Sequence, residues 1–365
     1  MSETGSGPLA GVRIIELGSL GPGPFGCMLL SDMGADVIRV DRPKSGDDDF
    51  PDVVLRGRRS VHLDLKSAHG VVALTRLLET SDVLCEGFRP GVLERLGFAP
   101  EKCWQLNERL IIARVTGWGQ EGPRSHTVGH DVNYAAVSGL LHTIGRAGGD
   151  PVIPLNIGAD GAGGWMLAFG IVCALLESRQ SGRGQVVDVA MVDASALLMA
   201  KWYGELAAGS WRDERGVNRV DGGSHYYNVY RTSDNRFLSV GAIEPQYYER
   251  FMTLLGIDPS TLPAQNERSF WPEQITRVAA ILKVQTLEHW LKIFENEEVC
   301  VVPVLGLNDA PRDLHLQERR TYIEVDGILQ PGEAPRFSRT PGAVRHIPKA
   351  GEHTKEVLDE LGLKQ

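Results

Sequence analysis

The chain has 365 residues and a formal net charge of -9 at pH 7, and 42% of its residues are hydrophobic against 23% charged. A single hydrophobic core rarely extends beyond roughly 250–300 residues, so this length predicts a soluble protein with two domains. The acidic balance, with a pI ≈ 5.6, argues against nucleic acid or an anionic membrane as the main partner. It leaves room for a local basic pocket that binds an anion.

The 5 cysteines are widely spaced and include no C-x-x-C pair, so the sequence supports neither a zinc site nor a disulfide framework. Because most of their neighbours are apolar, we expect buried, reduced thiols. The first residues lack the features of a signal peptide, no apolar run reaches the ~18 residues of a membrane span, and the last residues are not a peroxisomal tail. These observations predict a cytoplasmic protein without a metal site. The cysteines are Cys27, Cys85, Cys103, Cys173 and Cys300.

Apolar runs and helical segments alternate along the first half of the chain, which is typical of a doubly wound parallel sheet. A long apolar helix is expected at 163–180, and 181–206 predicts a turn, a strand and a long helix. The earlier strands are expected at 11–18, 35–43, 82–88 and 110–117, and the earlier helices at 24–34, 67–81, 90–97 and 101–109.

The pattern changes after about Gly209. Residues 222–242 predict two strands joined by the polar turn 233–235, and helices are expected at 245–256 and 286–297. This pattern indicates a smaller α+β domain. The predicted division is a large domain over 1–200, a linker over 201–220, the small domain over 221–325 and a return to the large domain over 326–365.

A glycine-rich turn after the first predicted strand fits G-x-G-x-x-G over 21–26, and Asp41 lies 20 residues beyond the first glycine. In that position the motif indicates a dinucleotide site. Pro22 and Pro24, however, remove two of the backbone N–H donors that would hold a phosphate, and Arg42 offers a cation beside Asp41. The glycines therefore favour close packing of the strand and the helix, or a different ligand.

The loop over 117–134, "GWGQEGPRSHTVGHDVNY", follows the strand expected at 110–117 and holds several titratable groups. Loops at strand ends are where α/β proteins usually place functional residues. His126 and His130 carry imidazole groups, the side-chain type that can accept or donate a proton near neutral pH. A solvated surface loop remains an alternative, as does a helix-capping role for Asp131.

Segments along nearly the whole chain, 8–362, resemble the family III CoA-transferases of the CaiB/BaiF type, and within them the branch of α-methylacyl-CoA racemases. The resemblance implies a large Rossmann-like domain with a smaller α+β domain, in an interlocked homodimer that shares its active sites. The segments include "PLAGVRIIELGSLGPGPFGCMLLSDMGADVIRVDRP", "DVLCEGFRPGVLERLG", "LIIARVTGWGQEGPRS", "GHDVNY" and "GEHTKEVLDELG".

The resemblance also implies a reaction, racemisation of 2-methylacyl-CoA thioesters through an enolate. His130 and Asp160 would transfer protons on opposite faces of the 2-carbon, and Glu244 from the other subunit would orient His130. Asp131 would lie near the reacting centre. An aspartate needs a raised pKa for this role, which burial or a neighbouring charge can provide. No separate cofactor is expected, because coenzyme A is part of the substrate.

Four arginines are implied as ligands of the coenzyme A portion, because its phosphates require cations. Arg42 and Arg95 are the leading ones, with Arg58 and Arg59 near the 3′-phosphate or the adenine. For each of them a surface ion pair is the alternative.

Three residues depart from the family pattern. His225 stands where relatives commonly have proline, in a loop expected near the acyl group, and the same loop departs again at Ser224. Gly161 stands where relatives usually have an aromatic residue. Two other activities stay open: a CoA-transferase with Asp160 as nucleophile, and a non-catalytic acyl-CoA-binding protein.

Overall fold

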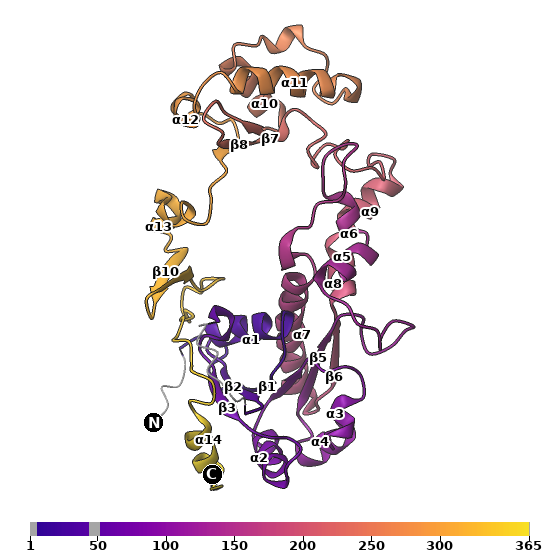
Figure 1. The fold of residues 1–365 in the computed structure, drawn as a ribbon, viewed down its shortest axis with the longest axis vertical. Helices are drawn as coiled ribbons and strands as arrows, with labels where there is room; N and C mark the ends of the chain where they lie inside the picture. Colours follow the sequence, from indigo (N-terminus) through magenta and orange to yellow (C-terminus); the bar gives the residue numbers. More distant parts are fainter. Residues whose placement is uncertain (1–5, 44–51, 365) are drawn as a thin grey trace. The chain divides into compact units, whose positions relative to one another are not determined.

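The computed structural model describes residues 6–43 and 52–364, which fold into two compact units (Figure 1). Unit 1 comprises 1–138, 155–198 and 314–365, and unit 2 comprises 139–154 and 199–313.

The two units differ in their boundaries from the predicted division. Residues 139–154 belong to unit 2, where Arg146 donates to Asn228 Oδ1 at 2.7 Å. The chain returns to unit 1 at Leu314, earlier than predicted. The hairpin that follows is held there because the buried Arg56 side chain donates to Gln330 Oε1 at 2.9 Å.

Unit 1 is built on a six-stranded sheet with the order β3-β2-β1-β4-β5-β6, in which every neighbouring pair is parallel. This is the strand order of the doubly wound dinucleotide-binding fold, so the predicted fold class is confirmed. The first strand in this order was not predicted, because its four residues begin with an arginine and are too few to show a pattern. The strands are β3 Arg59–His62, β2 Asp36–Asp41, β1 Arg13–Leu17, β4 Val83–Glu86, β5 Ile111–Thr116 and β6 Val186–Ala190.

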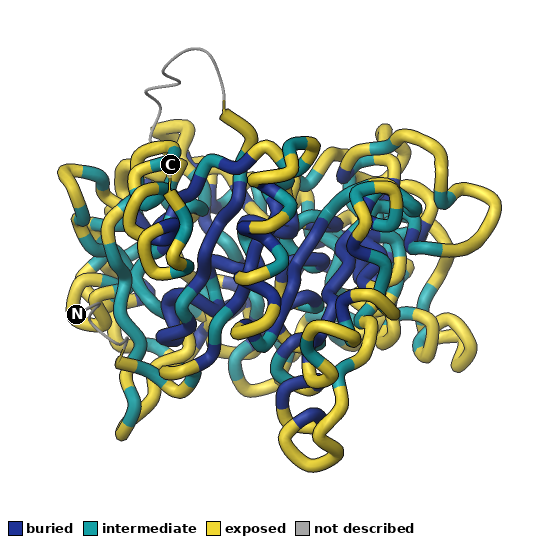
Figure 2. Tube along the Cα trace, turned by 90° about the horizontal axis from the view of Figure 1, so that it is seen from below, coloured by how far each residue is buried: buried dark blue, intermediate teal, exposed yellow. Residues whose placement is uncertain are grey.

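The central strands are apolar on both sides because helices cover both faces of the sheet. Ile15 and Leu17 face one core, which α2, α4 and α14 close, while Ile14 faces a second core closed by α1 and α7. Figure 2 shows these buried segments running through the interior, with exposed loops around them. The helices of unit 1 are α1 Pro22–Asp32, α2 Ala68–Glu79, α3 Val92–Arg95, α4 Pro100–Leu106, α5 Asp131–Val137, α7 Asp160–Ser181, α8 Met191–Leu198, α13 Leu314–Glu318 and α14 Thr354–Glu360.

Helices α1 and α7 approach each other at two glycines. A Cβ atom on Gly26 would lie 2.8 Å from the carbonyl oxygen of Gly164, and a Cβ on Gly164 would lie 3.1 Å from the amide nitrogen of Gly26. Only glycine permits this distance between backbones. The last glycine of the G-x-G-x-x-G pattern therefore serves helix packing, one of the two alternatives that the sequence left open.

Helix α7 is longer than the sequence predicted, since it begins at Asp160 and ends at Ser181. With its preceding turn it is long and apolar enough to cross a membrane by length and composition alone. Its inner face, which includes Leu167 and Ile171, packs against α1 and the sheet, as expected of a core helix. Its outer face exposes Trp165, Phe169 and Leu176.

Unit 2 contains a three-stranded antiparallel sheet, β7-β8-β9, over an aromatic core that includes Tyr226 and Phe251. The predicted turn at 233–235 joins the first two strands. Two exposed cysteines, Cys173 of unit 1 and Cys300 of unit 2, depart from the expected burial. The remaining elements are α6 Leu140–Thr143, α9 Ala200–Ala207, β7 Tyr227–Arg231, β8 Phe237–Gly241, α10 Pro245–Leu254, α11 Trp271–Leu282, α12 Leu287–Phe294 and β9 Val301–Pro303 in unit 2, with the hairpin β10 Tyr322–Val325 and β11 Ile328–Pro331 in unit 1.

Candidate active site

The loop after β5 folds around one aromatic ring. Tyr134 is buried, and a Cβ atom on Gly117 would lie 2.0 Å from its Cζ, while a Cβ on Gly129 would lie 2.8 Å from its Cε1. Trp118 packs edge-on against the same ring, with centroids 4.8 Å apart. Both ends of the loop are thereby held on Tyr134, which fixes the start of α5.

His130 and Asp131 begin helix α5, and they face different environments. The His130 side chain is exposed, and the backbone N–H of that residue donates to Asn133 Oδ1 at 3.0 Å. Asp131 is buried, and its Oδ2 accepts hydrogen bonds from the N–H groups of Ala159 at 2.7 Å and Asp160 at 2.9 Å. Asp131 therefore joins the start of α5 to the start of α7.

Asp160 is the first residue of α7 and is half-buried. Burial and the neighbouring carboxylate of Asp131 raise its pKa, while a hydrogen bond from Asn156 and the charge of His130 lower it. The carboxyl also lies at the start of α1, because a Cβ atom on Gly21 would stand 2.9 Å from Asp160 Oδ2. The first helical turn leaves the N–H groups of Gly161 and Ala162 without intrahelical acceptors.

The structure thus brings together three of the predicted residues, His130, Asp131 and Asp160. A half-buried carboxyl with a raised pKa holds its proton more readily than a solvated one, and the exposed imidazole beside it can accept a proton. Sequence reasoning considered Gly21 only within the phosphate-binding pattern. Its contact with Asp160 involves residues far apart in the chain, and no local signal could have indicated it.

Glu244 lies in unit 2, directly after β8 and at the start of α10. Its carboxylate is exposed and close enough to Cys300 to contribute to the raised pKa of that thiol, which is caused first by burial. Its pairing with His130 of another subunit stays a prediction.

Arg42 and Arg95 are exposed, and neither forms an ion pair with any residue of 6–43 or 52–364. Arg42 follows β2, and Arg95 ends the short helix α3, which comes after β4. Because the carboxyl ends of parallel strands share one edge of the sheet, both arginines lie on the edge that also carries the loop after β5. Binding of phosphate by these two arginines stays a prediction.

Comparisons with known proteins identify the family of this chain. The model of CoA-transferase family III matches residues 9–354. The chain belongs to this family. It is 44% identical over 362 residues to the α-methylacyl-CoA racemase of Mus musculus and 42% identical over 361 residues to that of Homo sapiens, in each case over 98% of this chain and 94% of the relative. A solved CAIB/BAIF family protein from Brucella suis has a TM-score of 0.83 at 25% identity, over 98% of this chain and 100% of its own.

Arg58 is not available as a ligand of the kind predicted from the family. Its side chain is fully buried and pairs with Glu16 Oε2 at 3.1 Å, and it donates to the carbonyl oxygens of Arg56 and Pro24. Glu16 in turn pairs with Arg39 at 2.5 Å. An uncompensated buried charge is costly, so Arg58 serves to neutralise Glu16 inside the sheet, and its guanidinium is not exposed to a ligand in this structure.

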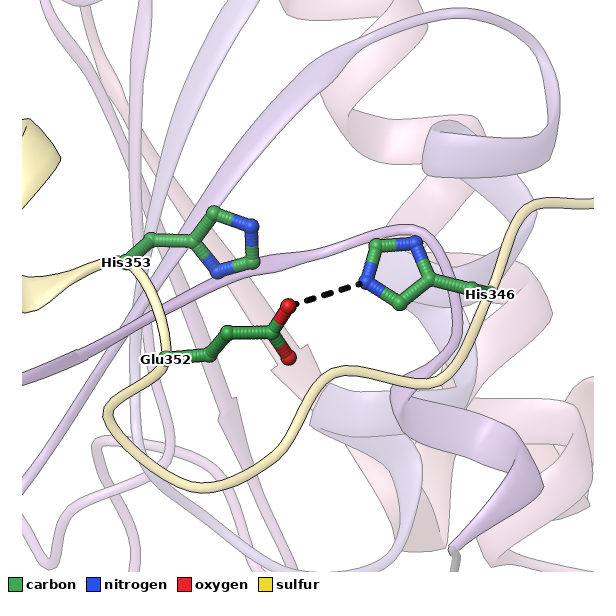
Figure 3. Close-up of side chains that lie close together, drawn as sticks. All are labelled: His346, Glu352 and His353. Atoms are coloured by element: carbon green, nitrogen blue, oxygen red, sulfur yellow. Dashed lines mark ion pairs between the residues drawn. The ribbon is translucent and has the colours of Figure 1, made fainter.

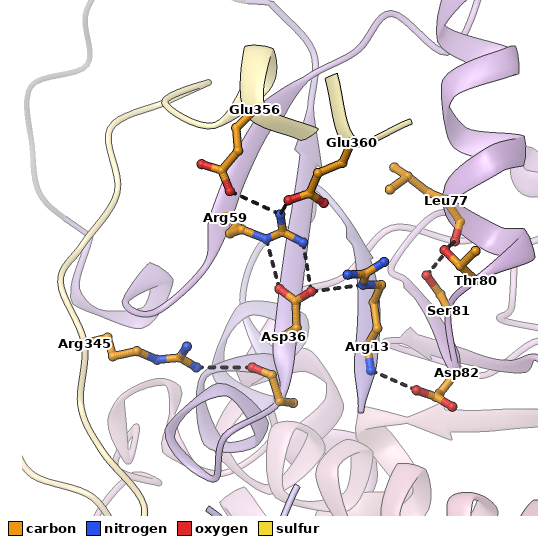
Figure 4. A network of polar contacts seen from close by, with 11 residues as sticks. Arg13, Asp36, Arg59, Leu77, Thr80, Ser81, Asp82, Arg345, Glu356 and Glu360 are labelled. Atoms are coloured by element: carbon orange, nitrogen blue, oxygen red, sulfur yellow. Dashed lines mark hydrogen bonds and ion pairs between the residues drawn. The ribbon is translucent and has the colours of Figure 1, made fainter. Parts of the chain in front are cut away.

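Arg59 is likewise engaged within unit 1 (Figure 4). Its guanidinium binds both oxygens of Asp36, at 3.0 and 2.8 Å, and pairs with Glu360 at 2.8 Å and Glu356 at 3.4 Å. Asp36 begins β2, so this network lies at the amino end of that strand, away from the edge that carries Arg42. The contacts tie α14 to the sheet and leave this arginine no role beside Arg42.

The segment that departs from the family pattern, Ser224-His225, is buried in unit 2 rather than placed beside an acyl group. His225 Nε2 lies 3.0 Å from the Tyr248 hydroxyl, its ring packs edge-on against Tyr226, and Tyr230 donates to its carbonyl oxygen at 2.6 Å. Burial lowers the pKa of His225 to about 4. The substitution relative to the family therefore alters a core.

A second group of ligand-type side chains comprises His346, Glu352 and His353, whose ligand atoms lie within 4.8 Å of one another (Figure 3). The N–H of Ser60 donates to His353 Nδ1 at 3.2 Å, so the neutral ring carries its proton on Nε2. A metal-bound histidine normally donates through its second nitrogen, and here that nitrogen accepts. We assign the group a structural role in holding the C-terminal segment against β3.

Proposed function

We propose that the protein catalyses the racemisation of 2-methylacyl-CoA thioesters by proton transfer at the 2-carbon. The observation that carries the proposal is the proximity of His130 to Asp160, a carboxyl whose pKa is raised by burial and by Asp131. Membership of the family and the identity to two racemases support the same reaction.

In the proposed reaction one group removes the 2-proton from one face while the other returns a proton to the opposite face. Neutral His130 is the base for one enantiomer, with protonated Asp160 as the acid, and the roles reverse for the other enantiomer. Asp131 acts through Asp160, because it holds the backbone N–H of that residue and disfavours its charged form.

The intermediate of this reaction is an enolate, whose oxygen needs hydrogen-bond donors. The first turn of α7 offers the N–H groups of Gly161 and Ala162, and the positive end of the helix dipole favours negative charge there. Neither residue has a bulky side chain, so a thioester oxygen can approach the backbone closely.

Exposed apolar residues on the segments that carry the site support an apolar acyl group. Leu20, which precedes Gly21, is 92% exposed, Val128, in the His130 loop, is 74% exposed, and Ile157 is 64% exposed. A Cβ atom on Gly161 would lie 3.6 Å from Ile157 Cγ2, which places that side chain at the start of α7. Exposed apolar side chains beside a site are available to contact an apolar ligand.

We further propose a homodimer in which Glu244 of the second subunit reaches His130. The outer face of α7 supports it, because Trp165, Phe169 and Leu176 repeat at helical spacing and leave an apolar stripe uncovered. The exposed carboxylate of Glu244 is free to orient an imidazole supplied by another chain.

Exchange of the 2-proton with solvent tests the proposal. Each enantiomer of a 2-methylacyl-CoA thioester, incubated with the enzyme in D2O, should gain deuterium at carbon 2 and reach the racemic mixture. Transfer of CoA to an added carboxylic acid, with a hydroxylamine-trappable acyl group on Asp160, would instead establish a CoA-transferase. Binding without exchange or transfer would identify a non-catalytic acyl-CoA-binding protein.

A further inference from the structure

Unit 2 contains a pocket of about 230 Å³ that the racemase reaction does not use. Three tryptophans line it, Trp202 from α9, Trp211 from the segment after that helix, and Trp271 from the start of α11. Two arginines, Arg219 and Arg268, lie at the same pocket. The pocket therefore combines aromatic faces with positive charge inside one unit.

The tryptophans present surfaces for a flat ring. Trp202 and Trp211 lie 4.7 Å apart between centroids and are tilted by 37°, so no third ring fits between them and a ligand ring would pack on an outer face. Trp271 is 3% exposed and is covered on one side by the Arg268 guanidinium, 5.6 Å from its ring centre. Aromatic rings of a ligand pack favourably on such surfaces in offset or edge-on geometry.

The polar groups of the lining are mostly unpaired donors. Within 6–43 and 52–364, Arg219 forms no ion pair, and no acceptor binds the indole N–H of Trp202 or Trp211. The Asn266 carbonyl already accepts from the Tyr226 hydroxyl at 2.7 Å, which leaves the amide nitrogen of Asn266 as a further donor. Donors without acceptors favour a ligand that carries acceptors, above all an anion.

The charge and volume of the pocket restrict that anion. Glu205 also lines the pocket, where it accepts from the Ser210 hydroxyl at 2.6 Å, and its negative charge opposes a dianion such as a phosphate monoester. The volume is below the ~300–1,000 Å³ of sites for drug-sized ligands, so it suits a molecule of one or two fused rings.

We propose that this pocket binds a small planar aromatic monocarboxylate, with the carboxylate on Arg219 and the ring on the outer face of Trp211. All of its lining residues belong to unit 2, whereas His130 and Asp160 belong to unit 1, and the proposal does not depend on the racemase reaction. The lining residues come from the segment 199–220 and from 266–271. These two segments are already in contact, because Arg268 donates to the carbonyl oxygen of Ser210.

Titration of the full-length protein with 2-naphthoate, followed by tryptophan fluorescence and by calorimetry, tests the proposal. We expect one saturable site per chain. Arg219→Gln should weaken binding by about tenfold or more, since a charge-assisted contact is lost. Arg236→Gln, which removes an exposed arginine of the β7–β8 turn, should leave the affinity unchanged.

Ligand variants and a second protein variant keep the test independent of folding. The neutral 2-naphthamide should bind at least about tenfold more weakly than the acid, and Glu205→Gln should improve binding of 2-naphthyl phosphate. Equal affinity of acid and amide, or unchanged binding in Arg219→Gln, would overturn the proposal. Displacement of 2-naphthoate by coenzyme A would also overturn it, because the acid would then occupy the substrate site.

Discussion

Asp160 in unit 1 and His225 in unit 2 are both titratable groups whose charged form is disfavoured by burial, yet their surroundings differ. Asp160 is half-buried, lies beside an exposed imidazole and stands at the start of two helices. His225 is 2% exposed and is enclosed by tyrosines. A shifted pKa serves proton transfer only where a substrate can reach the group. The raised pKa of Asp160 therefore indicates a catalytic role, whereas the lowered pKa of His225 reflects the free energy that burial of a histidine costs.

The largest effect on the reaction rate should come from removing the carboxyl of Asp160. Asp160→Asn should reduce 2-proton exchange by about 10²–10⁴-fold for the enantiomer that relies on it as base, since general acid–base groups contribute on this scale. His130→Ala should show the opposite enantiomer bias. Exchange rates measured separately for each enantiomer in D2O check the prediction.

The control for this prediction is Asp150→Asn, which removes an exposed carboxylate from residues 139–154. Its exchange rates and the Tm of all three variants should match the wild type. Equal losses for both enantiomers in both site variants would contradict the assignment of two bases on opposite faces.

The buried His225 should affect the free energy of unfolding and leave the reaction rate unchanged. The pKa of His225 is about 4 in the folded protein against 6.5 for an unperturbed histidine, so between these pH values the unfolded chain binds more protons. Stability therefore falls as pH drops from 6.5 toward 4, by about 3 kcal/mol in total. Denaturant unfolding of His225→Phe across this range should show a shallower fall.

His289→Gln removes an exposed histidine of α12 and provides the comparison for His225. It should keep the full pH dependence of unfolding, because it leaves His225 and the side chains around it unchanged. A His225→Phe variant that loses stability as steeply as the wild type below pH 6.5 would show that other groups control this dependence.

Arg95 and Arg58 extend the comparison to an exposed arginine and a buried one. Arg95→Ala should weaken binding of coenzyme A by about 1.5–3 kcal/mol with little change in Tm, as expected for a charge-assisted contact to phosphate. Arg58→Met should lower Tm instead, because it leaves Glu16 without one of its two arginine partners. Calorimetric titration with coenzyme A and thermal unfolding separate the two outcomes. Unchanged affinity in Arg95→Ala would exclude that residue from the site.

The smallest effect is expected for Asp131→Asn, which removes one charge beside Asp160 and keeps an oxygen that can accept the two backbone N–H groups. The pKa of Asp160 should fall toward its ordinary range, so the pH–rate profile should move to lower pH. At neutral pH the rate should change by less than about tenfold. A profile identical to the wild type would show that the charge of Asp131 does not act on Asp160.

Local patterns were sufficient for five of the six strands of the unit 1 sheet and for the loop that holds His130. The strands of the sheet centre are apolar runs, and "GHDVNY" lies in a loop whose glycines are needed to fold around Tyr134. Such features depend on neighbours in the chain, whereas the roles of His130 and Asp160 in proton transfer are predicted from the resemblance to the family.

Burial by distant residues could not be predicted in the same way. Arg58 stands in a basic stretch, "RGRRS", that suggests a surface, while its partner Glu16 belongs to another strand. His225 was placed in a loop near the acyl group, although Tyr230 and Tyr248 enclose it in the core of unit 2. In both cases the environment is set by contacts that no local pattern records.

The chain leaves unit 1 after Ser138 and returns at Leu155, so the passage through unit 2 separates His130 from Asp160. Its exposed stretch at Gly148-Gly149 is open to a protease. One cut there yields two fragments, each with one proton-transfer residue, which would be joined at the site by the hydrogen bonds from Ala159 and Asp160 to Asp131 and within the sheet by the pairing of β5 with β6. Recovery of racemisation on mixing separately produced fragments would therefore report reassembly of unit 1 as a split enzyme, with each half inactive alone.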